Sequence, residues 1–370
     1  MTGAAGSSAG LKRVLHVAKF YPPAAGGMER VVQTLCRASE GLVESRVLAL
    51  SSTRETTDEW VEGVAVTRVG VAARAGSVPI APSLSHHLRR AAADLIVLHE
   101  PNPWALLSYA IARPTAPLAI WYHSDVVRPP LQYALFYAPL ARAVYSRAQR
   151  FVVSSPPLGE HAAALQPYRD RVTVIPFGID PVQWVAPASG PAVDDEPFVL
   201  FVGRHVAYKG VDVLLRALAG TAIRAVIAGD GPQRASWERL AQTLGVAARF
   251  TGDVPDAELH RLFASCAALV LPSTTRAEAF GYVQLEAMAS GKPVIATDVP
   301  SGVSWVNQHE RTGLIVAAGD AAALRGALQR LMGDERLRTV LGRQARTRVE
   351  EVFTMAHLRE GLRRFYEEAA

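Results

Sequence analysis

The chain has 370 residues, of which 49% are apolar and 20% are charged, a composition typical of globular proteins and not of disordered or fibrous ones. Its length predicts two domains, and because no run of about 18 apolar residues is free of charge, we expect no membrane-spanning helix. The two cysteines, Cys36 and Cys266, predict small buried side chains and not a disulfide, a metal site or a nucleophile.

The N-terminus and the charge distribution bear on location and partners. The first ten residues are small and polar and lack the apolar core of a signal peptide, so we expect a cytoplasmic protein. The excess of Lys and Arg lies in residues 1–175, which predicts either an ordinary basic surface or attraction to an anionic membrane or a phosphorylated acceptor. No basic-aromatic repeat or nucleic-acid motif is present, so nucleic acid is not an expected partner.

Short apolar runs alternate with longer helical patterns along the whole chain. The first set of runs is Val14–Ala18, Arg46–Leu50, Leu95–Leu98, Leu118–Tyr122, Phe151–Ser154 and Val172–Ile175. The second set is Phe198–Val202, Ala225–Ala228, Arg249–Thr251, Ala268–Leu271, Val294–Ala296 and Leu314–Val316. They are rich in Val, Ile and Leu without alternation, as in strands buried on both faces. We therefore predict an α/β protein with two Rossmann-like, doubly wound parallel-sheet domains.

The domain boundary is predicted in residues 177–197, which are dense in Pro, Gly and acidic residues. This gives a first domain of residues 1–177 and a second of residues 178–354. A last helix, about residues 355–370, places four large apolar or aromatic side chains on one face: Leu358, Leu362, Phe365 and Tyr366.

In the first half, two loops that follow strands carry candidate chemistry. Gly26 and Gly27 lead into a helix, where backbone N–H groups can approach an anion, although a plain loop-to-helix turn is the alternative. His123 follows the strand Leu118–Tyr122 and is either a site residue or a structural histidine. The strand-end pair His99-Glu100 is a weaker candidate, for a position facing an acceptor.

In the second half, Arg204 and Lys209 follow the first strand, Phe198–Val202. A guanidinium can form a planar fork with phosphate oxygens, and an ammonium adds a point charge. A diphosphate leaving group needs both, because negative charge grows on it as the bond breaks. The alternative is two exposed cations at a strand-to-helix turn.

The segment Thr275–Thr297, TRAEAFGYVQLEAMASGKPVIAT, carries two carboxylates, Glu278 on a turn and Glu286 on the following helix. One carboxylate can accept hydrogen bonds from sugar hydroxyls and the other from both hydroxyls of a ribose. The pair therefore predicts a nucleotide-sugar site. No D-x-D metal motif is present, so we expect neither a metal nor another cofactor.

This segment resembles the E-x7-E motif of the retaining glycosyltransferases of family four, which have the GT-B fold with a cleft between two Rossmann-like domains. The resemblance implies that Glu278 contacts the donor sugar, Glu286 the ribose, and His123 the sugar hydroxyls beside the reaction centre. It implies diphosphate contacts and further donor-binding positions at Gly26, Gly27, Arg204, Lys209, Val254, Phe280, Gly281 and Tyr282. In that fold the last helix returns to the first domain.

The resemblance implies retaining transfer of a hexose from a nucleotide-diphosphate sugar to a hydroxyl, by front-side substitution. The run His123-Ser124-Asp125-Val126-Val127-Arg128 and the residues Gly302, Val303, Trp305, Val306 and Asn307 resemble a bacterial subgroup that builds surface polysaccharide. GDP-mannose is therefore the favoured donor, with UDP-sugars open, and a lipid-linked or oligosaccharide acceptor is expected. The segment Arg128–Arg150, with its Leu, Phe, Tyr and Arg side chains, predicts weak peripheral contact with the inner face of the membrane, or else an ordinary packed helix.

Two alternatives share these residues. A nucleotide-sugar 2-epimerase has the same fold but uses one substrate, so it needs no acceptor. A non-catalytic nucleotide-sugar-binding partner of another transferase is the second alternative, which the presence of His123, Arg204, Lys209, Glu278 and Glu286 disfavours.

Overall fold

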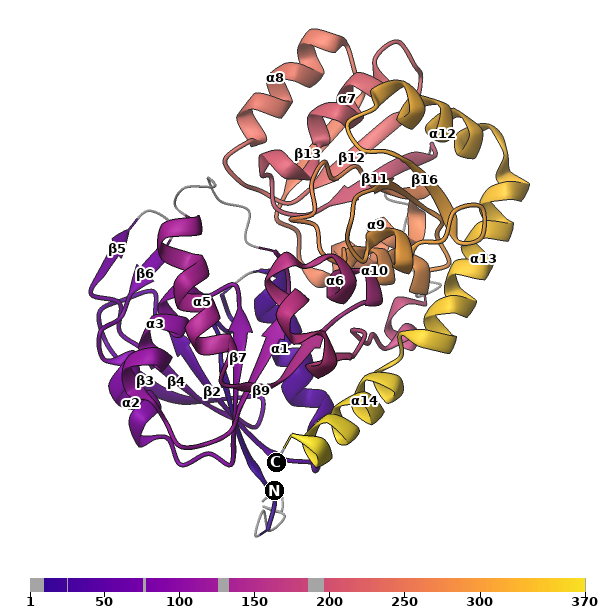
Figure 1. Cartoon of the computed structure of the whole chain (residues 1–370). Helices are drawn as coiled ribbons and strands as arrows, with labels where there is room; N and C mark the ends of the chain where they lie inside the picture. Colours follow the sequence, from indigo (N-terminus) through magenta and orange to yellow (C-terminus); the bar gives the residue numbers. More distant parts are fainter. Residues whose placement is uncertain (1–9, 25, 76–77, 126–132, 186–195, 370) are drawn as a thin grey trace, which may run out of the picture. The chain divides into compact units, whose positions relative to one another are not determined.

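The computed structural model describes residues 10–24, 26–75, 78–125, 133–185 and 196–369 (Figure 1). The chain divides into two compact units. Unit 1 comprises Met1–Ser154, Ala162–Ile175 and Leu358–Ala370, and unit 2 comprises Ser155–His161 and Pro176–His357. The end of the chain belongs to unit 1, and the short segment Ser155–His161, which the sequence placed in the first domain, belongs to unit 2. In the described part of the chain, no helix is long and apolar enough to cross a membrane.

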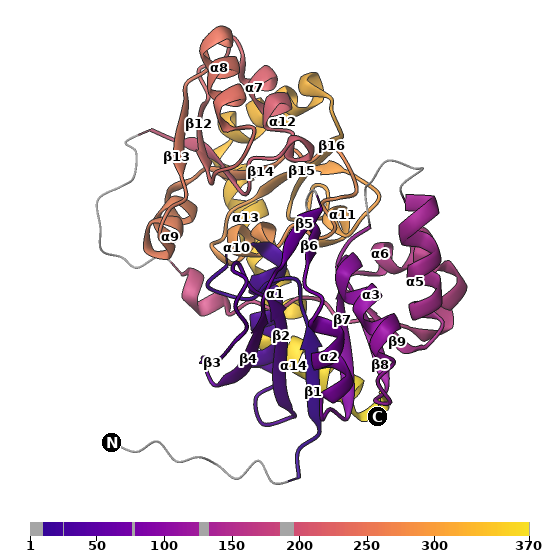
Figure 2. The same ribbon diagram turned by 90° about the vertical axis from the view of Figure 1, so that its left-hand side faces the viewer.

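Unit 1 is built on a sheet with the strand order β10-β9-β8-β7-β1-β2-β4-β3 among its described residues. Its strands are β1 Arg13–Val17, β2 Glu44–Leu50, β3 Thr57–Val61, β4 Val64–Val69, β7 Leu95–Glu100, β8 Leu118–Tyr122, β9 Ala148–Val153 and β10 Val172–Val174. Only β3, at one edge (Figure 2), runs antiparallel to its neighbour in this sheet as described. A separate antiparallel pair is formed by β5 Ala73–Ala75 and β6 Val78–Ile80.

The helices of unit 1 are α1 Gly27–Ala38, α2 Leu84–Arg90, α3 Pro103–Ala112, η1 Tyr133–Tyr137, α5 Ala138–Tyr145, η2 Ala163–Arg171 and most of α14, Met355–Glu368. The bounds of α14 confirm the predicted last helix, and its four predicted apolar positions are buried. Phe365 packs edge-on against Trp121 of β8 at a ring distance of 6.4 Å. The helix therefore covers one face of the unit 1 sheet by burying an aromatic side chain against it.

Unit 2 has a fully parallel sheet in the order β13-β12-β11-β14-β15-β16, over the residues described. Its strands are β11 Phe198–Val202, β12 Arg224–Ala228, β13 Ala248–Gly252, β14 Ala268–Leu271, β15 Val294–Asp298 and β16 Gly313–Ala317. Its helices are α6 Pro156–His161, η3 Pro181–Trp184, η4 Ala207–Lys209, α7 Val211–Leu218, α8 Arg234–Leu244, α9 Asp256–Ser265, α10 Val283–Ala289, α11 Val303–Val306, α12 Ala321–Gly333 and α13 Glu335–Val352.

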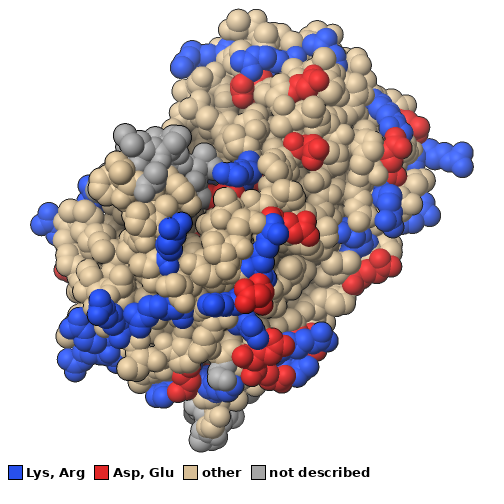
Figure 3. Space-filling view, viewed as in Figure 1, with Lys and Arg blue, Asp and Glu red and all other residues tan. Residues whose placement is uncertain are grey.

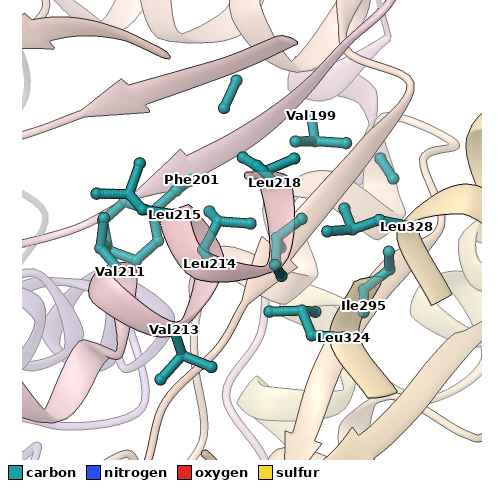
Figure 4. Packing of buried hydrophobic residues seen from close by; sticks show 14 of the residues in the cluster. Val199, Phe201, Val211, Val213, Leu214, Leu215, Leu218, Ile295, Leu324 and Leu328 are labelled. Atoms are coloured by element: carbon teal, nitrogen blue, oxygen red, sulfur yellow. The ribbon is translucent and has the colours of Figure 1, made fainter. Parts of the chain in front are cut away.

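The core of unit 2 lies where α7 and α12 pack on the sheet (Figure 4). Leu214 and Leu218 of α7 and Leu328 of α12 are fully buried there, with Phe201 of β11 and Ile295 of β15. Each fully buried apolar side chain of this size stabilises the fold by about 1.5–3 kcal/mol. This packing fixes the carboxyl ends of the strands, from which the candidate site is built.

The strand order of unit 2 reverses between β11 and β14, and that of unit 1 between β1 and β7. In open parallel sheets, ligands bind at the carboxyl ends of the strands beside such a switch point. The loops after β11 and β14 therefore mark the ligand-binding end of unit 2. The predicted strands are all present within a few residues, and the doubly wound architecture is confirmed.

Candidate active site

Two residues from different loops meet at the switch point of unit 2. Lys209, in η4 after β11, places its Nζ 2.5 Å from Oε2 of Glu278, in the loop after β14. Ser273 Oγ donates a second hydrogen bond to the same carboxylate oxygen, at 3.0 Å. The side chains of Lys209 and Glu278 are only 12% and 9% exposed. The structure thus brings together two predicted site residues that lie 69 positions apart in the sequence.

Backbone contacts hold these two loops against each other. Thr274 donates hydrogen bonds to the carbonyl of Tyr208 from its backbone N–H, at 2.8 Å, and from Oγ1, at 3.2 Å. Gly210 has φ +67, and a Cβ there would collide with the carbonyl oxygen of Pro272. Glycine is required at this position because a larger residue would be strained and would push the loops apart. The local sequence Lys209-Gly210 therefore sets the distance between the ammonium and the carboxylate.

The charge on Lys209 depends on its partner. Burial of the Lys209 ammonium favours its neutral form, but the Glu278 carboxylate and the hydrogen bond to it outweigh this effect and raise the pKa of Lys209 above its ordinary value. Lys209 is therefore protonated at neutral pH, and the pair is ionic. A ligand phosphate that contacts Lys209 would therefore share the ammonium with Glu278.

Arg204 lies at the start of the same loop and is exposed, in contrast to Lys209. The next residue, His205, is buried, and its backbone N–H donates to the carbonyl of Asp230 at 2.8 Å. The ring of His205 packs against Trp237 at 5.1 Å. The loop is thus anchored by its histidine, and it presents the guanidinium of Arg204 at the surface.

The segment after Glu278 turns sharply into α10. Gly281 has φ +69, and a Cβ there would lie 2.6 Å from Leu271. Phe280 is buried and packs edge-on against Phe177, while Tyr282 donates from its hydroxyl to the carbonyl of Gly178 at 2.8 Å. Phe280 and Tyr282 are therefore held in place by packing and hydrogen bonding inside unit 2.

The other predicted donor-binding residues lie within α10, after β13 and at the start of α1. Glu286, in α10, is 4% exposed. Val254 is half-buried after β13. Gly26 and Gly27 are exposed at the beginning of α1, where a Cβ on Gly26 would meet the carboxylate of Glu29. That carboxylate occupies the end of α1 at which a diphosphate was expected.

His123 of unit 1 is one of three histidines in a row. His16 Nδ1 lies 3.0 Å from His99 Nε2, and His99 Nδ1 lies 2.8 Å from His123 Nε2. All three rings are buried, and burial lowers the pKa of His16 to about 4 and that of His123 to about 3. The pKa of His99 is also lowered by burial, and by the charges of its two neighbours. The rings are therefore neutral at physiological pH.

The pair His99-Glu100 does not face solvent, because both side chains are fully buried. The Tyr137 hydroxyl donates to Oε2 of Glu100 at 2.6 Å. Burial raises the pKa of Glu100 to about 7, although the hydrogen bonds from Tyr137 and the Asn102 backbone act in the opposite direction. The burial of both side chains disagrees with the prediction that this pair faces an acceptor.

Among the residues that the structure describes, no group of three or more His, Cys, Asp or Glu side chains is arranged to hold a metal ion. Cys36 and Cys266 are both buried and free, as predicted. The residues Val126, Val127 and Arg128, part of the run that begins at His123, lie outside the described residues. The same holds for part of the predicted boundary segment, residues 186–195.

Comparison with known proteins places the chain in a family. Residues 182–348 match the glycosyl transferases group 1, and residues 25–183 match Glycosyltransferase Family 4. The chain therefore belongs to the group 1 glycosyltransferases and is a glycosyltransferase of the GT-B fold, as the sequence motifs predicted.

Two curated relatives match along nearly their whole length. D-rhamnosyltransferase WbpZ of Pseudomonas aeruginosa is 33% identical over 92% of this chain and 92% of its own. O-antigen chain mannosyltransferase C of Escherichia coli is 32% identical over 94% of this chain and 95% of its own. Among solved structures, sucrose-phosphate synthase of Thermosynechococcus elongatus matches 96% of this chain and 98% of its own with a TM-score of 0.79 and 23% identity. HepE of Anabaena, in complex with UDP-glucose, matches 96% and 99% with a TM-score of 0.77 and 20% identity.

Sequence reasoning missed two features of these sites. It treated Lys209 and Glu278 as independent ligand contacts and did not predict their ion pair. It also missed His16, whose signal was a histidine inside the apolar strand RVLHV, next to the strand that carries His99. A polar residue in a strand buried on both faces needs a hydrogen-bond partner, which is the observation that would have found it.

Proposed function

We propose that this chain transfers a hexose, with mannose favoured, from a nucleotide-diphosphate sugar to a hydroxyl of a lipid-linked or oligosaccharide acceptor in the synthesis of cell-surface polysaccharide. The observation that carries the proposal is the buried Lys209–Glu278 pair at the switch point of unit 2, with Arg204 at the start of the same loop. A cation for phosphate and a carboxylate for sugar hydroxyls then lie side by side, as the two ends of a sugar diphosphate require.

The names of the relatives support the choice of sugar and pathway. Two relatives that match along nearly their whole length are named a D-rhamnosyltransferase and an O-antigen chain mannosyltransferase. A structure of similar fold contains UDP-glucose, so this fold can hold a nucleotide sugar. We favour GDP-mannose as the donor and keep UDP-sugars as the alternative.

In the proposed reaction, Arg204 and Lys209 stabilise the negative charge that develops on the leaving diphosphate. Glu278 accepts hydrogen bonds from the donor sugar and Glu286 from the ribose. His123 lies beside the sugar hydroxyls, while Gly26, Gly27 and Val254 line the rest of the donor site. The acceptor oxygen attacks the anomeric carbon from the side of the leaving phosphate, which takes the acceptor proton, so the anomeric configuration is retained.

We further propose that the reaction needs no metal ion, because the cations of Arg204 and Lys209 neutralise the diphosphate. Transfer should then continue in EDTA at the rate seen without it. Loss of transfer in EDTA, with recovery on adding magnesium or manganese, would contradict this part of the proposal.

Incubation with the donor alone tests the class of reaction. A transferase leaves the nucleotide sugar intact, apart from slow hydrolysis, until an acceptor is added. Accumulation of an epimerised sugar without acceptor would instead identify the 2-epimerase alternative. A protein that binds the nucleotide sugar but never converts it, with or without acceptor, would be the non-catalytic partner.

A further inference from the structure

The three histidine rings of unit 1 lie on one face of its sheet because of strand periodicity. Side chains two residues apart on a strand share a face. Val97 is paired in register with His16, and His99 is paired with Trp121. His16, His99, Trp121 and His123 therefore project to the same side. Consecutive histidine rings are 5.3 and 5.1 Å apart, and the His99 ring is stacked on that of His123.

The row is buried inside unit 1. All three imidazoles are at most 8% exposed, and Trp121 stacks against both His99 and His123. Phe365 of α14 packs edge-on against the same tryptophan. A hydrogen bond in such surroundings is not exchanged for water, so the proton positions along the row are set by the rings themselves.

The protons of the three neutral imidazoles can be placed along the row in two ways. Each neutral imidazole has one N–H and one acceptor nitrogen, and each contact between rings takes one proton. In the first arrangement, His16 Nδ1 donates to His99 Nε2, His99 Nδ1 donates to His123 Nε2, and His123 carries its proton on Nδ1. In the second arrangement every proton moves to the other nitrogen, and His123 donates from Nε2.

The far end of the row decides between them. His16 Nε2 is buried and has no hydrogen-bond partner among the described residues. In the second arrangement this atom would be a buried N–H without an acceptor, which proteins rarely tolerate. In the first it is only an unused lone pair, which is less costly. The lowered pKa values of the three rings disfavour a third arrangement that contains an imidazolium.

We propose that His16 and His99 are positioning residues, which hold His123 in the tautomer protonated at Nδ1 through two consecutive imidazole hydrogen bonds. The role of His123 at the donor sugar rests on the proposed function. In that site, a His123 fixed in this way is a neutral hydrogen-bond donor to an oxygen atom. Its Nε2 lone pair is used by His99, so His123 does not act as a general base.

The first test is the tautomer itself, measured by ¹⁵N NMR of the imidazoles in the full chain without substrate. The His123 signals are assigned by their loss in His123→Gln. We expect wild-type His123 to carry its proton on Nδ1, and His99→Phe, which keeps a flat ring but has no nitrogen, to show a mixture of tautomers. A wild-type His123 protonated at Nε2, or an unchanged tautomer in His99→Phe, would overturn the proposal.

The second test is rescue. The side-chain amide nitrogen of Asn is bonded to Cγ, as imidazole Nδ1 is, so His99→Asn keeps a donor toward His123. His99→Phe should lower kcat about a hundredfold, as loss of one aligned donor does, with little change in the KM for the donor sugar. His99→Asn should regain the Nδ1 tautomer and most of the turnover. Equal kcat in the two variants would mean that His99 serves only packing.

Two controls separate this effect from loss of stability. Val17→Ala removes two buried methyl groups from the opposite face of β1, and it should lower the stability of the fold without changing the tautomer of His123. His86→Asn removes an exposed histidine outside the row and should change neither the stability of the fold nor the tautomer of His123. If His99→Phe does not fold, the pair His16→Leu and His16→Asn makes the same comparison from the far end of the row. Because the NMR readout needs no substrate, it stands even if the proposed transfer activity fails.

Discussion

Lys209 and Glu278 form a buried ion pair with 2.5 Å between Nζ and Oε2. The pair joins the loop after β11 to the loop after β14, the two strands between which the strand order of unit 2 reverses. Each residue was predicted to contact a different part of one ligand. Their pairing means that the residue expected to contact phosphate also holds the carboxylate expected to contact the sugar.

Removing one partner of this pair should destabilise the fold. Lys209→Met leaves a buried carboxylate without its cation, which typically costs about 3–5 kcal/mol in the free energy of unfolding. The double variant Lys209→Met with Glu278→Gln should recover part of this loss, because no buried charge remains. Urea denaturation measures all three proteins. Arg216→Met, which breaks an exposed pair with Asp212, is the control and should cost less than about 1 kcal/mol. Additive costs in the double variant would show that the pair is not coupled.

Arg204 should separate activity from stability, because its side chain is exposed. Arg204→Ala should lower turnover about a hundredfold or more, corresponding to about 2.7–4 kcal/mol of lost transition-state stabilisation. Its free energy of unfolding should remain that of the wild type. Arg239→Ala, an exposed arginine on α8, is the matched control and should keep full turnover. Normal turnover in Arg204→Ala would remove this residue from the site.

The buried carboxyl of Glu100 predicts a pH-dependent stability. Its folded pKa of about 7 lies above the ordinary value of 4.5, so the folded state binds this proton more tightly than the unfolded state does. The corresponding stability is lost as the pH rises from 4.5 to 7. Glu100→Gln keeps an acceptor for Tyr137 but has no titratable group. Its free energy of unfolding, relative to that of the wild type, should therefore rise by about 3 kcal/mol as the pH increases from 4.5 to 8.

The measurement is urea denaturation of wild type and Glu100→Gln at several pH values. Taking the difference between the two proteins cancels the contribution of the histidine row, because these histidines are neutral in the folded protein but bind protons in the unfolded chain in part of the same pH range. A stability difference that does not change with pH would show that folding leaves the pKa of Glu100 at its ordinary value.

Membrane contact, predicted for Arg128–Arg150, depends on the face that η1 and α5 present to solvent. Leu135 and Phe136 are 60% and 75% exposed, and Arg142 of α5 and Arg147, in the turn after α5, are also exposed. Arg150 instead lies 3.7 Å from Glu368 in an ion pair. In the view of Figure 3, basic side chains of unit 1 also gather around α2, which carries Arg89 and Arg90 in its last turn. Residues 128–132 of the segment lie outside the described residues.

We expect the protein to sediment with anionic vesicles at low salt and to be released as the salt concentration rises. Arg142→Gln and Arg147→Gln should each weaken binding by about 1 kcal/mol, and Phe136→Ser should weaken it further by removing apolar contact. Arg150→Gln is the control and should have the smallest effect. Equal binding to neutral vesicles, or none to either kind, would show that this face is not a membrane contact.

Most of the fold could be predicted because buried parallel strands are continuous apolar runs. Phe198–Val202, Ala268–Leu271 and Leu118–Tyr122 have the predicted bounds. The strand β3, Thr57–Val61, was not predicted because most of its side chains are exposed and polar. It is an edge strand joined to β4 through Glu62 and Gly63, both with positive φ. A two-residue turn of this kind indicates a hairpin more strongly than the pattern of apolar residues in the strands does.

The candidate site was predictable only as separate motifs. Spacing placed Arg204 and Lys209 after a strand, Glu278 on a turn and Glu286 on the following helix, but which side chains meet depends on the order of strands in the sheet. β11 and β14 are neighbours although two strands lie between them in sequence. The same holds for His16 and His99 on β1 and β7, which pair across a long insertion. Local patterns do not contain this information.

The central claim is tested most directly by product analysis with a panel of nucleotide sugars and a lipid-linked oligosaccharide acceptor. We predict that GDP-mannose gives the most product, that the product appears only with the acceptor, and that the new linkage has the anomeric configuration of the donor. Transfer from a UDP-sugar with retention would change the donor but keep the proposed reaction. A product of inverted configuration, or no transfer from any donor while Lys209 and Glu278 are intact, would contradict the account.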